Sequence, residues 1–141
     1  MSDLATRTRS GPGRLLIAVY AVFALAATAR SAVQLGTRFD EAPLPYLLSA
    51  FAAVVYVLAT ACLVRGDRAS RTVATVSIVV ELVGVLVVGT LSLVDPAAFP
   101  EATVWSDYGR GYGFVPAVLP LLGLWWLRVS AGTLGRSAGS R

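Results

Sequence analysis

The chain has 141 residues, of which 56% are hydrophobic and only 14% are charged, and its formal net charge at pH 7 is +4. Together with a mean hydropathy of +0.71, this composition excludes an ordinary soluble domain with a polar surface and is typical of a protein in a lipid bilayer. The basic residues are scattered over tails and short loops, which argues against a nucleic-acid-binding face. We therefore expect one membrane domain, with the lipid bilayer as a partner and no nucleic acid.

The residues that most often carry catalytic or metal chemistry are missing. His is absent and Cys62 is the single cysteine, so the sequence offers no disulfide and no Cys/His metal cluster. We interpret Cys62 as a small buried apolar side chain, with a reactive or palmitoylated thiol as the alternative. No nucleotide motif or catalytic constellation is present. The sequence thus predicts a protein that is not an enzyme and that has no cofactor and no metal.

Four apolar runs follow one another along the chain, over residues 15–35, 46–64, 72–94 and 112–129. At a rise of about 1.5 Å per residue, roughly 20 helical residues cross a hydrocarbon core about 30 Å thick. Each run can span, the last one with local thinning of the bilayer or flanking aromatic side chains. The sequence therefore predicts an all-α, polytopic four-transmembrane-helix bundle over residues 15–129, flanked by tails at 1–14 and 130–141.

Most arginines fall on one side of this four-span arrangement, namely Arg7, Arg9, Arg14, Arg65, Arg68, Arg71, Arg128, Arg136 and Arg141. The positive-inside rule makes that side cytoplasmic, so both termini are expected inside the cell. Trp125 and Trp126 precede Arg128, as expected for aromatic residues at a membrane boundary. Basic residues are all Arg and never Lys, which we attribute to GC-rich coding. The expected location is a bacterial inner membrane, crossed several times.

A cleaved signal peptide is an alternative for residues 1–26. An Arg-containing start, an apolar stretch at 15–24 and the small-residue tract Ala24-Leu25-Ala26 resemble such a peptide. Cleavage would leave three spans. We favour the intact chain because the apolar pattern resumes at residues 31–35 and a short loop then joins the second run. The mass of the N-terminus would decide between the two.

Glu81 is the only ionisable residue between Thr72 and Val94. An acidic group at the centre of a bilayer costs roughly 3 kcal/mol on insertion scales, and such residues usually face the interior of a bundle. Its Val, Ile and Leu neighbours outweigh this cost at about −0.4 kcal/mol each. Without a cation nearby, we expect burial to keep this carboxyl neutral. Glu81 is therefore either a helix contact or a proton or cation site.

Several polar side chains are expected near the depth of Glu81. Ser77 and Gly84 lie one helical turn away, and Tyr56 of the second run reaches nearly the same depth, with Thr60 one turn along. Tyr56 either bonds Glu81 or packs as an aromatic. Arg30 either extends outward to lipid headgroups or turns inward to neutralise Glu81. The candidate intramembrane cluster comprises Glu81, Tyr56, Ser77, Arg30, Gln34 and Thr60.

The longest external connection, residues 95–111, is rich in glycine and aromatic residues, and we expect it to lie as a cap on the outer mouth of the bundle. Asp107 and Arg110 are placed either to pair locally or to bind a headgroup or partner. Pro116 is expected to begin the fourth helix and Pro120 to kink it. Candidate contact residues in and next to this loop are Trp105, Asp107, Tyr108, Arg110 and Tyr112.

The segment from Trp105 to Arg128, WSDYGRGYGFVPAVLPLLGLWWLR, resembles small uncharacterised four-helix integral membrane proteins of GC-rich bacteria. This resemblance covers mainly the last third of the chain, and it implies a fold and a membrane location but no activity. Small multidrug-resistance transporters are also short four-span proteins with a membrane Glu, but their Glu lies in the first span.

Two functional hypotheses follow from these features. The first is a non-enzymatic accessory or scaffold subunit, in which Glu81, Tyr56 and Arg30 hold helices together and the partner is a second copy or another membrane protein. The second is a small oligomeric transporter or channel with Glu81 as its proton or cation site. A membrane enzyme acting on a lipid-like substrate has little support, because a lone carboxyl lacks an orienting partner in the sequence.

Overall fold

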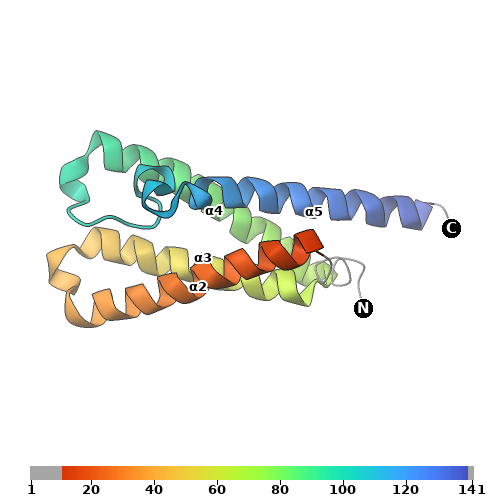
Figure 1. The fold of residues 1–141 in the computed structure, drawn as a ribbon, viewed down its shortest axis with the longest axis horizontal. Coiled ribbons are helices and arrows are strands. Elements are labelled where there is room, and N and C mark those ends of the chain that lie inside the picture. The colour runs from red at the N-terminus through yellow and green to blue at the C-terminus, as the bar shows by residue number, and fades with distance from the viewer. Residues whose placement is uncertain (1–10, 140–141) are drawn as a thin grey trace.

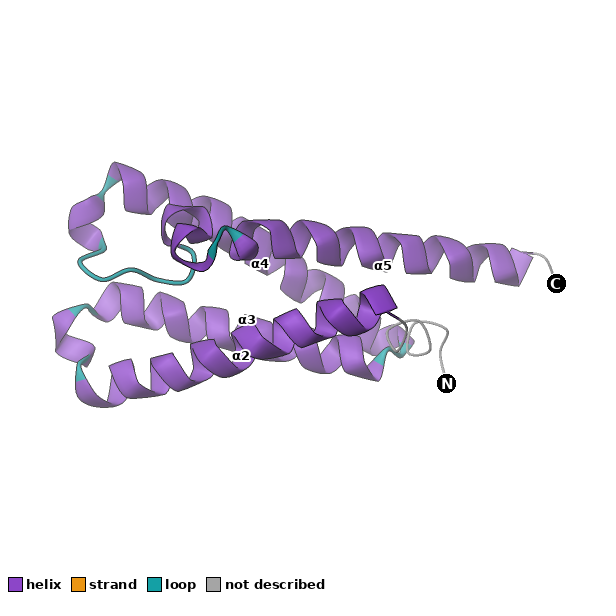
Figure 2. Ribbon diagram, viewed as in Figure 1, coloured by secondary structure: helices purple, strands orange, loops and turns teal. Residues whose placement is uncertain are grey.

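The computed structural model describes residues 11–139, with side chains described as far as Val129. Four long helices dominate this part of the chain: α2 (Gly11–Thr37), α3 (Pro43–Arg65), α4 (Arg68–Val94) and α5 (Val115–Gly139). Three short 3-10 helices connect them: η1 (Phe39–Glu41), η2 (Pro96–Ala98) and η3 (Ser106–Tyr112). All regular secondary structure within residues 11–139 is helical, and the longest non-helical connection, residues 99–105, is the extended teal loop in Figure 2. The expectation of an all-α protein is confirmed.

The helices form an elongated bundle whose two ends differ (Figure 1). At one end lie the α2–α3 connection and the chain between α4 and α5, and we call this the loop end. At the other lie the Gly66–Asp67 turn, the start of α2 and the end of α5, and we call this the turn end. In this bundle α2 packs on α3, α3 on α4, and α4 on α5, whereas α2 and α5 touch over a shorter stretch.

Helices α2, α3 and α4 are each long and apolar enough to cross a membrane. A fourth crossing requires η3 to be taken together with Val115–Val129 of α5, and these two segments meet at a bend of 97°. Large apolar side chains, including Leu25, Val54, Leu86 and Leu121, are exposed on all four long helices. An exposed apolar surface of this extent matches a lipid environment and confirms the expectation of a membrane protein.

The fourth helix differs in its bounds from the expected run at 112–129. It begins at Val115, after η3, and continues to Gly139, so residues 130–139, expected as part of a tail, are helical. Pro116 occupies the first turn, where a missing N–H costs little. Pro120 lies inside the helix, where it removes a backbone hydrogen bond. The expectations for residues 1–10 lie outside the described part of the chain.

The turn between α3 and α4 shows why these two helices end and begin where they do. Gly66 has a φ of 68°, the left-handed conformation that glycine adopts without strain, and its N–H bonds to Cys62 O. The Asp67 side chain then accepts a 2.7 Å hydrogen bond from Ser70 N, so Asp67 is the N-cap of α4. This hydrogen bond, more than the nearby Arg65 guanidinium, lowers the pKa of Asp67 below its ordinary value.

Replacing Asp67 by Ala is expected to lower thermal stability, because Ser70 N loses its acceptor at the start of α4. Since the pKa of Asp67 is lower in the folded state, its contribution is present above the ordinary Asp pKa. It is lost as the pH falls through the lowered value. Melting temperatures of wild type and Asp67→Ala should therefore converge in acid. Asp67→Asn is the control, because Asn caps helices without titrating and should keep its advantage over Ala at every pH.

Candidate functional site

Glu81 lies at the centre of the bundle, thirteen residues from each end of α4 (81 − 68 = 94 − 81 = 13). Its side chain is 0% exposed. Tyr20 of α2 donates a 2.8 Å hydrogen bond to Glu81 Oε1, while Oε2 is buried with no hydrogen-bond partner among the described residues. One hydrogen bond therefore links α2 to α4. The second carboxyl oxygen is buried and has no hydrogen-bond partner among the described residues.

The phenol of Tyr20 also packs closely against α5. A Cβ built on Gly123 would lie 3.0 Å from the Tyr20 hydroxyl and 3.0 Å from Ile78 Cδ1, so only glycine fits there without displacing a neighbour. The bond between Tyr20 and Glu81 is thus enclosed by α2, α4 and α5. Neither Tyr20 nor Gly123 was among the candidate residues from the sequence.

Tyr56 of α3 is fully buried beside this pair, and of its two alternatives the structure has the aromatic packing. Its hydroxyl accepts a 3.1 Å hydrogen bond from Trp105 Nε1. Its ring lies with its centroid 6.3 Å from that of Tyr20 and 5.6 Å from that of Phe23. The bond to Glu81 comes from Tyr20 and not from Tyr56, which packs in the aromatic layer next to it.

Trp105 enters the bundle from the loop end, so we call residues 99–114 the inserted segment. Its side chain is 1% exposed, and a Cβ built on Gly84 would lie 2.6 Å from its Cζ3 atom. Gly84 is ten residues from the end of α4 (94 − 84 = 10), or about 15 Å at helical rise. The inserted segment is therefore not the expected cap on the mouth of the bundle. Because Gly84 has no side chain, the Trp105 indole fits deep between the helices.

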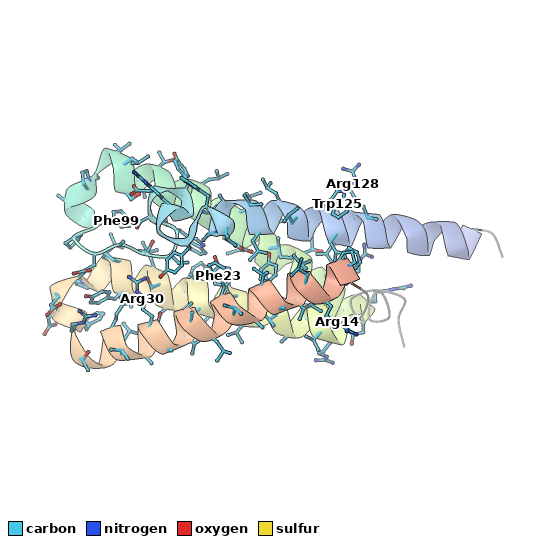
Figure 3. The ribbon with its side chains drawn as sticks, in the orientation of Figure 1. Arg14, Phe23, Arg30, Phe99, Trp125 and Arg128 are labelled. Atoms are coloured by element: carbon cyan, nitrogen blue, oxygen red, sulfur yellow. The ribbon has the colours of Figure 1, made fainter. Side chains whose placement is uncertain are left out.

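Arg30 does not turn inward to Glu81. Its guanidinium donates from Nη1 to the Tyr112 hydroxyl and from Nη2 to Ala102 O, the latter at 3.0 Å. Phe23 lies earlier on α2, with its ring centroid 5.9 Å from that of Tyr112. Figure 3 shows Arg30 and Phe23 in the half of the molecule nearer the loop end, and Arg14 and Arg128 nearer the turn end. Arg30 therefore connects α2 to the inserted segment and does not neutralise Glu81.

The remaining candidate residues of the membrane cluster are Ser77, Thr60 and Gln34, and their side chains have other surroundings. Ser77 is buried on α4 one turn from Glu81. Thr60 donates within its own helix to Tyr56 O at 2.7 Å. Gln34 is buried near the loop end, and its Oε1 has no partner among the described residues. None of these three side chains therefore forms a hydrogen bond with the Glu81 carboxyl.

In the inserted segment, Asp107 and Tyr108 are fixed against α4. Asp107 N donates to Ser92 Oγ at 2.9 Å, and the Tyr108 hydroxyl lies 2.8 Å from Thr90 Oγ1. No ion pair joins Asp107 to Arg110: the one ion pair within residues 11–129 joins Arg65 to Asp67 at the turn end. Arg110 is exposed.

The chemistry available around Glu81 is limited. In the described part of the chain, no group of three His, Cys, Asp or Glu side chains is placed to hold a metal ion. Glu81 lines neither the apolar groove of about 510 Å³ between α2 and α5 nor the polar pocket of about 610 Å³ at the loop end. The buried Glu81 carboxyl can accept a hydrogen bond from Tyr20 or carry a proton. Searches against protein-family models, curated proteins and solved structures found no match.

Proposed function

We propose that this protein is a non-enzymatic accessory or scaffold subunit of a membrane assembly. The observation that carries this proposal is the buried hydrogen bond between Tyr20 and Glu81, with Tyr56, Trp105 and Gly123 closing around it. A carboxyl that is fully buried and bonded to another helix acts as a contact between helices. Its partner in the assembly is a second copy or another membrane protein.

The proposed topology has four crossings with both termini on the cytoplasmic side of a bacterial inner membrane. The distribution of charge over the described residues supports this orientation. Arginines gather at the turn end, namely Arg14, Arg65, Arg68, Arg71 and Arg128, whereas most acidic residues belong to the loop end, namely Asp40, Glu41, Asp95, Glu101 and Asp107. The basic end is expected to face the cytoplasm.

Glu81→Gln tests the scaffold function. Gln keeps an acceptor for Tyr20, but its amide N–H groups replace an oxygen that has no partner among the described residues, so we expect a loss of about 1 to 2 kcal/mol in unfolding free energy. Purified wild type in liposomes should move neither protons nor cations above empty vesicles. Thr60→Ala is the control, because its hydroxyl bonds only within its own helix. Unchanged stability of Glu81→Gln would contradict the proposal.

A small oligomeric transporter or channel is the second candidate. It is favoured by Glu81 Oε2, which has no hydrogen-bond partner among the described residues. In that case Glu81 exchanges a proton or cation, and Glu81→Gln should abolish pH-dependent uptake in liposomes while the protein still folds. Flux by wild type that is lost in Glu81→Gln would replace the scaffold function with this one.

A further inference from the structure

A polar pocket of about 610 Å³ opens at the loop end, between α2 and the inserted segment. Its lining includes Arg30, Thr103, Ser106, Asp107, Arg110 and Tyr112. The groove between α2 and α5 is, by contrast, lined almost entirely by apolar side chains. Two guanidinium groups and one carboxylate therefore line one recess at the loop end.

Arg30 forms no ion pair with an acidic side chain of the described residues. Its two hydrogen bonds go to neutral acceptors, the Tyr112 hydroxyl and Ala102 O, and no ion pair forms at this end among the described residues. A guanidinium carries five N–H donors in a fixed plane, so donors remain after these two bonds. A half-buried cation without a counter-ion is unfavourable, and a bound anion would compensate it.

The pocket is also held in a defined shape. Tyr112 and Ala102 fix the plane of the Arg30 guanidinium from the inserted segment. In the inserted segment, Asp107 and Tyr108 have φ values of 52° and 59°, a left-handed conformation that is strained for residues other than glycine. Their bonds to Ser92 and Thr90 of α4 hold this conformation. Backbone strain of this kind occurs preferentially at binding sites, and here it precedes Arg110 in the pocket lining.

We propose that this pocket binds a phosphate group between the guanidinium groups of Arg30 and Arg110. Arginine binds phosphate oxygens in bidentate geometry and is the preferred residue for that purpose. Two guanidinium charges and the Asp107 carboxylate give a net charge of +1 (2 − 1 = 1), which matches the single charge of a phosphodiester. The volume leaves space for a polar substituent beyond the phosphate itself. A lipid headgroup and a soluble phosphate ester carry the same group, and the experiment distinguishes them.

The test uses the full chain in detergent and measures its melting temperature. Inorganic phosphate is compared with chloride at equal ionic strength. Phosphatidylglycerol in mixed micelles is compared with a phosphate-free glycolipid. Stabilisation by inorganic phosphate without lipid indicates a soluble ligand, and stabilisation by phosphatidylglycerol alone indicates a headgroup. If neither raises the melting temperature above its control, the proposal is overturned.

Three variants test the site itself. Arg110→Gln should weaken the apparent affinity for the stabilising probe about tenfold, as expected for one lost charge-assisted hydrogen bond. Arg38→Gln is the matched control, because Arg38 is an exposed arginine at the same end that does not line the pocket. Asp107→Asn should bind as well as wild type or more tightly, because it removes a repelling charge. Equal losses in Arg38→Gln and Arg110→Gln, or weaker binding by Asp107→Asn, would overturn the proposal. Binding is measured independently of flux, so its failure leaves the scaffold function untouched.

Discussion

Replacing Trp105 by Ala is expected to lower the free energy of unfolding by about 3 to 5 kcal/mol, the usual range for truncating a buried tryptophan. The change empties a space between α3 and α4, because the indole is 1% exposed and lies against Gly84. It also removes the donor to the Tyr56 hydroxyl. Unfolding in mixed micelles with increasing SDS would measure the difference.

Trp105→Phe separates the two contributions, since it keeps much of the ring but not the N–H. Its expected cost is smaller, with about 1 kcal/mol from the lost bond to Tyr56 and the rest from the smaller ring. A loss in Trp105→Ala no greater than in Trp105→Phe would show that the inserted segment does not depend on this side chain for its position.

Gly84→Ala probes the same contact from the opposite side. The new methyl group would lie 2.6 Å from the indole, and overpacking of this kind costs about 1 to 3 kcal/mol. In a Trp105→Ala background the cost should disappear, because the atoms that it would meet are gone. Gly36→Ala is the matched control, because a Cβ at this helical glycine meets nothing within 4 Å. Equal effects at Gly84 and Gly36 would contradict the close packing.

The long helices were predictable because their signals are local. The expected runs at 46–64 and 72–94 lie within α3 and α4, and the Gly66–Asp67 turn between them has the usual glycine C-cap and aspartate N-cap. The first run was expected to begin at Leu15, whereas α2 begins at Gly11. The residues Gly11-Pro12-Gly13 discourage a helical prediction, although proline is well tolerated in a first turn.

Depth along the helix does not identify Tyr20 as the partner of Glu81. Counted from Leu15, Tyr20 is five residues inside the helix (20 − 15 = 5), or about 8 Å. Counted from Gly11 it is nine residues inside (20 − 11 = 9), or about 14 Å, still less than the roughly 20 Å from Arg68 to Glu81. Tyr56 is indeed buried at this level, but depth alone does not show which of two phenols reaches the carboxyl.

The insertion of Trp105 depends on its packing against Gly84 of α4. The sequence of the loop alone does not indicate this contact. A tryptophan next to a membrane span is as typical of an interface as of a buried position. The informative signal is in the facing helix, where Gly84 and Gly89 interrupt a Val-rich run. Glycine inside a helix is unfavourable unless another group approaches closely. The structure places Trp105 against Gly84 and Tyr108 against Gly89.

Tyr20→Phe is expected to lower the free energy of unfolding by about 1 to 2 kcal/mol. The reason is not a change in shape, since Phe fills nearly the same space, but the loss of the hydrogen bond to Glu81 Oε1. The carboxyl would then be fully buried without a hydrogen-bond partner among the described residues, because Oε2 already has none. Unfolding by SDS in mixed micelles gives the required free energies.

A double-mutant cycle with Glu81→Leu shows whether this loss belongs to the pair. In the Glu81→Leu background the Tyr20 hydroxyl is itself the buried group without an acceptor, so Tyr20→Phe should then be neutral or stabilising. Tyr108→Phe is the matched control, because its hydroxyl bonds to Thr90 at an exposed position, and its effect should be the same in both backgrounds. If Tyr20→Phe costs as much in the Glu81→Leu background as in the wild-type protein, the bond between α2 and α4 does not hold the bundle together. The buried carboxyl then loses its structural role and Glu81 is better explained as a transport site.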